Sequence, residues 1–547
     1  MATIDKPTVN EPNDRDPHNN NSFGTLVDSA PEGIELPVLN VEDFNERIIR
    51  SYESGGAEKS LEADLSVARS LVPVGTAAFR DFSYVSPEIP EFIVENCTGC
   101  MDCVTQCPDT AILGKVLSET DLNTKLAGIE DETDREMFGN QWAKTRKYYD
   151  APQKKGHEGG RFAILIDPSK CKGCAECVTV CDDLALEMIP KSEKTMDDIR
   201  KSHRFFKEFG PSDDTYINDK LLIDMMLKEE THIYVGGAGS CAGCGEGTAL
   251  RMMCAATGAM HGDQWGIVAA TGCNTVYTST YPYNPYLVPW TNSLFENAPA
   301  DAMGVRARWD QMGKDEQPIW CIGGDGAMFD IGFQSLSRML ATGMNINAFI
   351  LDTQVYSNTG GQASTASFMG QNTKMSLHGK KYKGKQERRK EMAQIAIMHP
   401  NTFVAQTTCA HTNHFYKSVI RALEYDGPSV IICYTTCQPE HGVADNMAAD
   451  QARLAVDSRA FPMMTYDPDA GATIKERMSL QGNPGMKNDW WTNPKTKEEV
   501  NFIDFCRSEG RFSKHFDKEG NPSEILLAAT QERLDNWHVL QELAGLI

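Results

Sequence analysis

The sequence has no long apolar run and no leader-like start. No stretch of about 18 apolar residues, the length needed to cross a membrane, occurs along the chain. Residues 1–10 are polar and acidic, without the basic and apolar segments of a secretory signal. We therefore expect a protein that is neither exported nor embedded in a membrane, and that resides in the cytoplasm.

Positive charge is also scarce. The 53 Lys and Arg residues face 76 Asp and Glu residues, which gives a formal net charge of −23. This balance argues against nucleic acid and anionic membrane surfaces as main partners, although acidity also serves solubility. With 547 residues, 41% of them hydrophobic, the chain is long enough for several globular domains with large cores.

Disulfide bonds are not expected either, although the chain has 17 cysteines. Disulfide-dense chains are usually short and secreted. Five cysteines stand alone and are interpreted as small buried apolar residues. They are Cys254, Cys321, Cys409, Cys433 and Cys506. The other twelve fall into groups with the spacing of metal ligands.

Eight of these twelve form two runs with the spacing Cys-x₂-Cys-x₂-Cys-x₃-Cys. Such runs are typical of bacterial two-cluster ferredoxins, where the fourth Cys of each run ligates the cluster of the other run. A pair of zinc sites is the alternative, but zinc sites rarely space four cysteines so closely. The second run ends in Cys181-Asp182, where proline is usual. We expect one [4Fe–4S] cluster on Cys97, Cys100, Cys103 and Cys181, and another on Cys171, Cys174, Cys177 and Cys107.

A glycine-rich turn follows the predicted buried strand 319–322. Glycines at the carboxyl end of such a strand let the backbone approach a ligand, and Asp325 offers a hard oxygen for Mg²⁺. The next helix, near 330–340, would turn free N–H groups toward a diphosphate. Gly-Asp-Gly alone fits an ordinary tight turn equally well. A second predicted strand, 347–351, would bring Thr353 and Val355 to the same edge of the sheet.

Gly324-Asp325-Gly326, followed by Asp-Thr-x-Val-Tyr-Ser-Asn-Thr-Gly-Gly-Gln at 352–362, resembles the thiamine diphosphate domain of pyruvate:ferredoxin oxidoreductases and related 2-oxoacid oxidoreductases. The resemblance implies that Asp325, Thr353 and the main-chain carbonyl of Val355 hold Mg²⁺. It also places Asn358 beside the reacting carbon as a catalytic residue. Many other thiamine enzymes have Asn where Thr353 stands. The implied cofactor-binding residues are Gly324, Asp325, Gly326, Thr353, Val355 and Asn358.

A third cysteine group is expected beside this site. The pair Cys241-x₂-Cys244 alone could be a redox pair, half a zinc site or half a cluster site. Cys273 and Cys437 follow the predicted strands 265–270 and 429–434, so both should emerge near Asp325. In the family that the chain resembles, the positions that match Cys241, Cys244, Cys273 and Cys437 bind a third [4Fe–4S] cluster.

We expect an α/β protein, with a doubly wound thiamine diphosphate-binding sheet fused to an α+β ferredoxin-like domain that carries two [4Fe–4S] clusters. Residues 1–72 are predicted to form a disordered arm and a small extension with helices at 41–52 and 58–71. Residues 73–230 would hold a connector and the ferredoxin-like domain, with an insert at 109–170. Residues 231–547 would form the thiamine domain and a helical tail.

A basic stretch and three histidines are predicted to have no role in the active site. The basic stretch 379–391 is interpreted as a solvated loop that leads into a helix, with an acidic partner or coenzyme A phosphates as the alternative. We expect His399, His411 and His414 to have packing or surface roles and not to bind metal.

The resemblance implies oxidative decarboxylation of pyruvate with coenzyme A to acetyl-CoA and CO₂, with electrons passing through three clusters to ferredoxin or flavodoxin. 2-Oxoglutarate and other 2-oxoacids are alternative substrates. A non-catalytic electron-transfer subunit is a second alternative, against which Asp325, Thr353 and Asn358 argue. Because few residues precede Cys97, we expect separate subunits to supply the pyrimidine-side thiamine domain and the coenzyme A domain.

Overall fold

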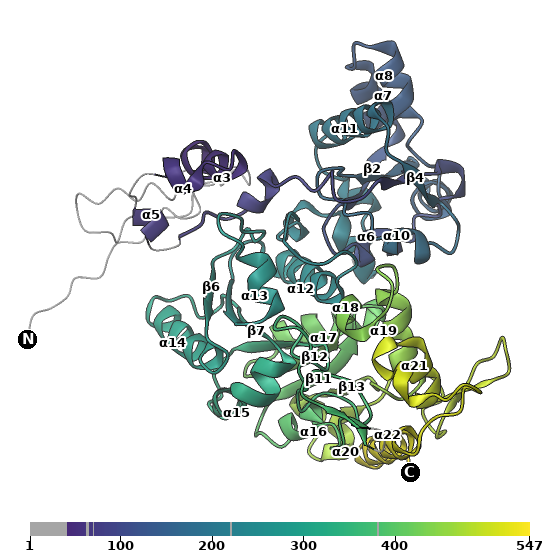
Figure 1. The fold of residues 1–547 in the computed structure, drawn as a ribbon. Coiled ribbons are helices and arrows are strands. Elements are labelled where there is room, and N and C mark those ends of the chain that lie inside the picture. The colour runs from purple at the N-terminus through teal and green to yellow at the C-terminus, as the bar shows by residue number, and fades with distance from the viewer. Residues whose placement is uncertain (1–40, 62–64, 69–70, 219–220, 380–381) are drawn as a thin grey trace, which may run out of the picture.

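The computed structural model describes residues 41–61, 65–68, 71–218, 221–379 and 382–547. The predicted arm at residues 1–38 lies outside these ranges. Figure 1 shows a large body built on a sheet and a smaller body that stands above it. Among the helices in these ranges, none combines the length and apolar character needed to traverse a bilayer.

The large body is built on an eight-stranded sheet in the order β14-β13-β11-β12-β8-β7-β5-β6. The six strands from β11 to β6 are parallel, while β13 and β14 are antiparallel at one edge. All four strands predicted from apolar runs are present. The strands are β5 (Gly266–Ala270), β6 (Trp290–Ser293), β7 (Ile319–Gly324), β8 (Asn347–Asp352), β11 (Phe403–Thr408), β12 (Ser429–Tyr434), β13 (Met464–Tyr466) and β14 (Met478–Ser479).

Helices cover both faces of this sheet, which confirms the doubly wound prediction. On one face α12 (Gly245–His261) and α17 (Thr412–Glu424) pack against alternate residues of the central strands. The intervening residues face the second core, so β8 and β12 are buried along their whole length. The second face is covered by α14 (Ala298–Gln311), α15 (Phe333–Leu340), α16 (Met392–Ala396), α19 (Ala448–Asp457), α21 (Phe502–Ser508) and α22 (Glu524–Leu543).

Short elements fill the connections of the large body. The predicted C-terminal helix is confirmed as α22, and all five isolated cysteines are buried as expected. The remaining short elements are α13 (Cys273–Thr278), η10 (Gly326–Ile331), β9 (Leu377–His378), β10 (Lys383–Gly384), α18 (Gln438–His441), η11 (Pro468–Ala470), α20 (Ile474–Arg477), β15 (Trp491–Thr492), β16 (Glu499–Val500) and η12 (Gly510–His515).

The order of the strands in the large sheet brings several strand ends together. The chain runs from β5 outward to β6 and then returns to the other side of β5 as β7; it later skips from β8 to β11 before β12 fills the gap. Ligands of open α/β sheets bind where the strand order reverses in this way. The carboxyl ends of β5, β7, β8 and β12 are therefore neighbours.

The smaller body has two antiparallel strand pairs and two short helices. Strand β1 (Glu88–Phe92) pairs with β4 (Leu186–Pro190), and β2 (Ile112–Ser118) pairs with β3 (Gly160–Ile166). The helices that contain the third cysteine of each run are α6 (Asp102–Gln106) and α10 (Glu176–Thr179). This symmetric arrangement is compatible with the predicted α+β ferredoxin-like domain.

The boundaries of the predicted insert, 109–170, need correction. Its two ends are the paired strands β2 and β3, which belong to the core of the smaller body. Only residues 119–159 project, and they pack with α11 (Glu193–Glu208) around Phe138 and Trp142. The projecting part contains α7 (Glu119–Ala127), α8 (Glu132–Gly139), η6 (Arg146–Asp150) and α9 (Ala151–Lys154).

The extension before the smaller body packs on the large body. Helical turns from Val41 to Glu53 confirm the first predicted helix, and Phe44 and Ile48 are buried against Tyr281 and its surroundings. The predicted helix at 58–71 is divided instead, because Leu61 is extended between α4 (Ala57–Ser60) and α5 (Leu65–Ala68). The later connections contain η4 (Thr76–Phe79), η5 (Val94–Asn96), η7 (Asp214–Tyr216), η8 (Leu222–Leu227) and η9 (Glu229–Thr231).

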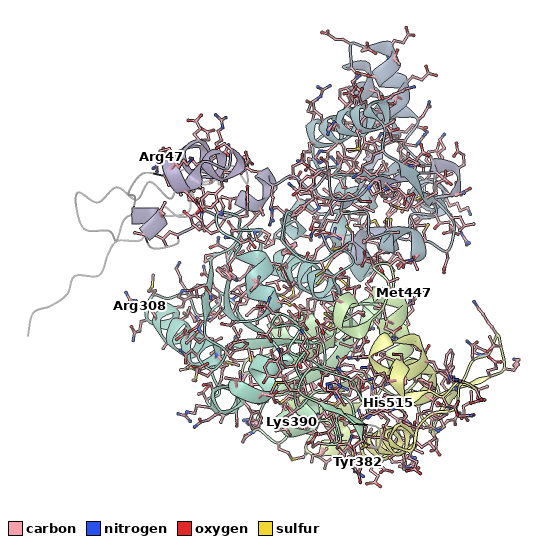
Figure 2. The ribbon with its side chains drawn as sticks, viewed as in Figure 1. Arg47, Arg308, Tyr382, Lys390, Met447 and His515 are labelled. Atoms are coloured by element: carbon pink, nitrogen blue, oxygen red, sulfur yellow. The ribbon has the colours of Figure 1, made fainter. Side chains whose placement is uncertain are left out.

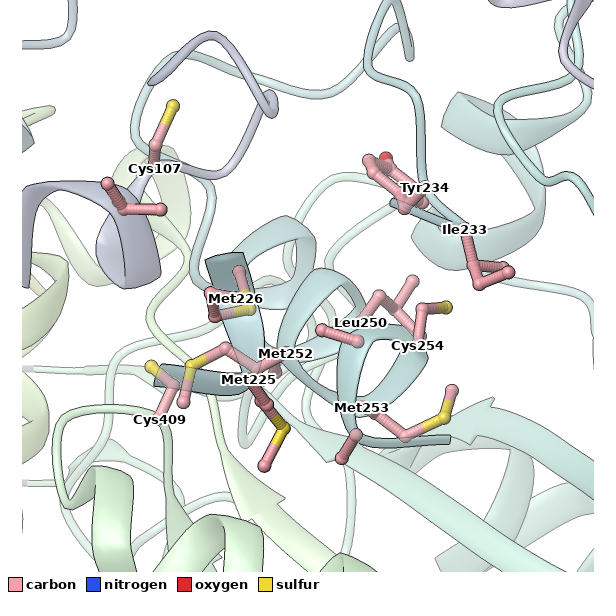
Figure 3. Close-up of a cluster of buried hydrophobic side chains, with 14 of the residues drawn as sticks. Cys107, Met225, Met226, Ile233, Tyr234, Leu250, Met252, Met253, Cys254 and Cys409 are labelled. Carbon is pink, nitrogen blue, oxygen red and sulfur yellow. The ribbon is translucent and has the colours of Figure 1, made fainter. Parts of the chain in front are cut away.

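Helix α12 joins the two bodies. Its residues from Gly245 to Gly258 are all buried, an unusual pattern for a helix unless it is enclosed on every side. Figure 3 shows Met225 and Met226 beside Met252 of α12, with Cys409 next to them. These methionines therefore belong to the core that holds α12 in place.

Candidate active site and cysteine sites

Three predicted oxygen ligands meet at the ends of β7 and β8. Asp325 follows β7 directly, and Thr353 follows β8. Thr353 Oγ1 lies 3.1 Å from Asp325 Oδ1 and 3.0 Å from the main-chain oxygen of Val355. All three residues are buried. The arrangement offers a carboxylate, a hydroxyl and a carbonyl oxygen to one hard cation.

The carboxylate of Asp325 is held on both oxygens. The N–H of Thr353 donates to Oδ1 at 3.2 Å, and Ser364 Oγ donates to Oδ2. Burial, and then the neighbouring carboxylate of Asp352, raise the pKa of Asp325 to about 7. A bound divalent cation would oppose both effects and keep Asp325 ionised.

The negative charge of Asp352 is paired with an arginine from the basic stretch 379–391. The guanidinium of Arg389 donates to Asp352 Oδ2, and both side chains are fully buried. Arg389 belongs to the stretch 379–391, which was predicted to be a solvated loop. That interpretation is wrong for Arg389 and Lys385, which are buried, whereas Arg388 is exposed. Lys390, marked in Figure 2, is half-buried and donates to the carbonyl of Phe329.

The glycines beside Asp325 differ in what they require. A Cβ on Gly326 would lie 2.5 Å from the ring of Tyr356, so a larger residue would displace that ring. A Cβ on Gly324 would meet nothing closer than 3.7 Å. Of these two positions, only 326 therefore requires glycine because of contacts with other described residues.

A groove runs from these glycines to Asn358. Its lining includes Gly324, Asp325, Gly326, Thr353 and Asn358 together with Phe295. The exposed side chain of Asn358 lines both this groove and the neighbouring cavity of Cys273. Asn358 therefore lies at the boundary between the groove and a cysteine site.

The structure gathers the twelve grouped cysteines into three sites, each lining its own cavity. The two runs exchange their fourth cysteines, in the pairing expected from the spacing. The outer cysteine site consists of Cys97, Cys100, Cys103 and Cys181. The middle cysteine site consists of Cys107, Cys171, Cys174 and Cys177. The inner cysteine site consists of Cys241, Cys244, Cys273 and Cys437.

Several thiols of these sites are buried and lie close to one another. Burial, followed by the thiols of Cys100 and Cys97, raises the pKa of Cys103. Burial and the thiol of Cys174 act in the same way to raise the pKa of Cys177. Within the described ranges, no three His, Cys, Asp or Glu side chains are arranged to hold a single metal ion. A four-iron cluster needs only one cysteine for each iron, so its four sulfurs need not converge on one point.

The middle and inner cysteine sites are tied together by Lys172. Its ammonium nitrogen lies 2.6 Å from Asp109 Oδ1 and 2.8 Å from the main-chain oxygen of Ser240. Lys172 lines the middle site, and Ser240 lines the inner site beside Cys241. The ammonium group and its partners are buried, so this link is protected from water.

A tight loop positions the inner site. Gly243 has φ +67°, and a Cβ there would lie 1.7 Å from the carbonyl oxygen of Asp445. The loop of Cys241 and Cys244 consequently packs directly on the segment that follows Cys437. Gln438 completes the contact by donating to the carbonyl of Gly243.

Sequence reasoning missed Glu246 and His441. Glu246 is buried in the first turn of α12 and lines both the groove and the inner cysteine site. Burial, and then Asp325, raise its pKa to about 8, and its Oε2 has no hydrogen-bond partner among the described residues. In the sequence, only its position two residues after Cys244 indicated that Glu246 lies near the site. His441 follows Cys437 by one helical turn and is fully buried.

Three histidines away from the groove hydrogen-bond neighbouring hydroxyl groups. His399 contacts Ser337 Oγ at 2.8 Å, and His411 and His414 hydrogen-bond Thr408 and Thr407.

A family comparison fits the site. Residues 270–433 match the model described as "Thiamine pyrophosphate enzyme, C-terminal TPP binding domain". The matched range contains Asp325, Thr353 and Asn358, together with the strands that carry them. The class defined by fold and site is therefore that of thiamine diphosphate-binding domains.

Curated relatives define the family more closely. The chain is 26% identical to the "Probable pyruvate-flavodoxin oxidoreductase" of Escherichia coli (strain K12), over 86% of this chain and 42% of the relative. It is 27% identical to the "Pyruvate:ferredoxin oxidoreductase" of Moorella thermoacetica, over 95% and 47%. The chain is thus similar to pyruvate:ferredoxin and pyruvate-flavodoxin oxidoreductases and spans less than half the length of these relatives.

A solved 2-oxoglutarate:ferredoxin oxidoreductase from Magnetococcus marinus is 19% identical and covers 37% of this chain and 65% of its own. Its TM-score of 0.32 is too low for a structural argument.

Proposed function

We propose that this chain is the thiamine- and cluster-bearing subunit of a pyruvate:ferredoxin oxidoreductase. The complex would convert pyruvate and coenzyme A to acetyl-CoA and CO₂ and pass the electrons to ferredoxin or flavodoxin. One observation carries the proposal: the groove and the inner cysteine site share Glu246, Cys273, Thr353, Ser357 and Asn358 as lining residues. A redox centre that adjoins the groove is what an enzyme needs to remove electrons from a bound substrate.

The residues of the groove fit Mg²⁺ and thiamine diphosphate. Asp325, Thr353 and the carbonyl of Val355 would hold Mg²⁺, and N–H groups at the start of η10 would be available to bind the diphosphate. Thiamine diphosphate supplies the stabilisation of the carbanion formed on decarboxylation. Asn358 would act as the catalytic side chain at the reacting carbon, because it lies where the groove adjoins Cys273.

The three cysteine sites would hold three [4Fe–4S] clusters in series. The inner site adjoins the groove, and Lys172 links it to the middle site. The outer site contains Cys100, which is exposed, so an external carrier could receive electrons there. We propose this order, inner to middle to outer, as the route to ferredoxin or flavodoxin.

Further subunits would supply the pyrimidine-side thiamine domain and the coenzyme A domain. Support comes from exposed apolar side chains on segments that border the site: Val276 of α13, Leu294 before Phe295, and Ile331 of η10. Exposed apolar surface of this kind is typical of interfaces. We propose that the complex acts in the cytoplasm and involves no nucleic acid or membrane.

The test is anaerobic purification of the chain with and without the proteins that copurify with it. The complex should reduce ferredoxin with coenzyme A and pyruvate, faster than with 2-oxoglutarate or a branched-chain 2-oxoacid. The chain alone, with clusters reconstituted, should not turn over. Faster reaction with another 2-oxoacid would overturn the choice of pyruvate. A complex that carries iron but neither binds nor needs thiamine diphosphate would identify an electron-transfer subunit instead.

A further inference from the structure

Arg251 is a buried guanidinium at the junction of the two bodies. It lies on α12 of the thiamine domain, and only 3% of its surface is exposed. The guanidinium enters the smaller body, where Nη1 donates to the main-chain oxygens of Val104 and Cys107, and Nη2 donates to that of Ile112 at 3.1 Å. All three acceptors are neutral carbonyls.

No carboxylate neutralises this charge within the described ranges of the chain. No Asp or Glu oxygen there lies within 4.0 Å of the guanidinium nitrogens. The one carboxylate among its electrostatic neighbours, Asp109, is already paired with Lys172 at 2.6 Å. Burial of a charge without a counter-charge is costly, so an anionic group is expected beside Arg251.

The middle cysteine site lies where that anionic group is needed. Cys107 and Ile112, whose carbonyls Arg251 binds, both line this site. Figure 3 shows Cys107 on the loop that approaches α12.

The other charged groups that line the middle site already have partners. Lys172 is paired with Asp109, and the carboxylate of Glu176 accepts the N–H groups of Ala448 and Ala449. Arg251 is therefore a buried cation next to this site without a carboxylate partner among the described residues. Lys191, which acts on Cys171, donates to the carbonyl of Ser83 and is only half-buried.

We propose that Arg251 is a positioning residue for electron transfer: it is the fixed counter-charge of the iron–sulfur cluster in the middle cysteine site and raises that cluster's reduction potential. The inference rests on the proposed function, which places a cluster there. Reduction adds one electron, drawn from the inner site during turnover, and makes the cluster one unit more negative. A neighbouring cation stabilises this reduced form. Because a guanidinium keeps its proton, the effect needs no coupled proton transfer.

The experiment is a potentiometric titration of the reconstituted full-length protein with dithionite, followed by electron paramagnetic resonance. In Arg251→Met the potential of the middle cluster should fall by at least 59 mV, which is a tenfold change in a one-electron equilibrium. The inner cluster should keep its potential. Arg251→Lys, which retains the charge, should restore most of the shift.

Arg459→Met is the matched control. Arg459 is also buried and also donates to carbonyls, those of Pro484, Gly485 and Asp489. Its guanidinium lies over the ring of Trp537 in α22, and it lines none of the three cysteine sites. This variant should leave all three potentials unchanged although it removes the same number of charges.

The outcomes separate the inference from the proposed function. If the unaltered protein binds no iron after reconstitution, the proposed function fails. If all clusters load and Arg251→Met leaves the middle potential unchanged, the role of Arg251 is refuted. If Arg251→Met loses the middle cluster, Arg251→Gln and Arg251→Lys are compared instead. The inference requires that Arg251→Gln lowers the potential of the middle cluster or loses that cluster, and that Arg251→Lys keeps both the cluster and its potential. Equal behaviour of these two variants overturns the inference.

Discussion

His441 donates a hydrogen bond from Nε2 to the main-chain oxygen of Thr353, with a separation of 2.8 Å. Its Nδ1 accepts from the N–H of Cys437. Burial, and then Arg511, lower the pKa of His441, so the ring is neutral and its 3.5 Å approach to Glu509 is not an ion pair. One side chain thus connects the oxygen ligand set with the inner cysteine site.

Replacing His441 should loosen both sites at once. In His441→Ala the carbonyl of Thr353 loses its buried partner, at a cost of about 1–3 kcal/mol. We expect weaker retention of thiamine diphosphate and a perturbed inner-cluster spectrum, with normal outer and middle spectra. His399→Ala, which removes a half-buried histidine away from the site, is the control. Unchanged thiamine content in His441→Ala would show that the link is dispensable.

Asp325 should be essential for the cofactor but not for the cofactor-free fold. Asp325→Asn removes the charge that would bind Mg²⁺, so thiamine diphosphate should be lost on gel filtration while cluster absorbance remains. Because the carboxylate is buried beside Asp352, its neutralisation should not lower the apparent unfolding midpoint of the cofactor-free protein. Normal thiamine retention in this variant would move the cofactor site elsewhere.

Two nearby cysteines should differ sharply in their effect on iron content. Cys437 lines the inner cysteine site, whereas Cys433 is a buried core residue of β12. The protein should bind about twelve iron atoms, and Cys437→Ser about eight, by the rule of four cysteines for each cluster. Cys433→Ser should keep about twelve. Equal iron contents in the two variants would contradict the assignment of Cys437.

The pairing of Arg389 with Asp352 predicts a large difference between two adjacent arginines. Arg389→Met leaves a buried carboxylate unpaired, which should destabilise the thiamine domain by about 3–5 kcal/mol. Arg388 is exposed, so Arg388→Met should have little effect. The measurement is the apparent unfolding midpoint of each variant in denaturant. Similar midpoints would restore the interpretation of this stretch as a solvated loop.

Acid should weaken the junction between the two bodies through His232. Burial, and then Arg251, lower its pKa to about 4, below an unfolded value of about 6.5. Between these two pH values the unfolded chain therefore binds one proton more than the folded chain, so the contribution of His232 to the free energy of unfolding falls as pH decreases from 6.5 to 4. Over that range His232→Gln should lose less stability than the unaltered protein, and the difference is at most about 3 kcal/mol. Parallel pH profiles for the two proteins would contradict this.

Apolar runs made much of the thiamine domain predictable. The strands that begin at Ile319, Asn347 and Ser429 are continuous apolar segments because both of their faces are covered. Once these strands were assigned, Asp325, Thr353 and Cys437 had to emerge at one edge. The cysteine spacing predicted the exchange between the two runs in the same direct way.

The predictions failed where charged residues are buried and paired with residues that lie far away in the sequence. Lys115 interrupts the apolar pattern of β2, yet it is buried with its ammonium group on the carbonyl of Phe206. That contact hid a core strand inside the supposed insert. Arg389 looked solvated because its partner, Asp352, lies 37 residues earlier. Glu246 resembled an ordinary acidic residue in the first turn of a helix.

The buried contact of Lys172 with Ser240 has a mechanical consequence. Since one end of this contact belongs to the middle cysteine site and the other to the inner site, the two bodies cannot swing apart without exposing a charged ammonium group and its partners. Gln106 and Thr110 add further bonds across the same junction, to the carbonyls of Cys409 and Tyr234. Electrons would therefore cross a rigid joint of fixed length, and no moving carrier arm is needed between the groove and the exposed edge of the molecule.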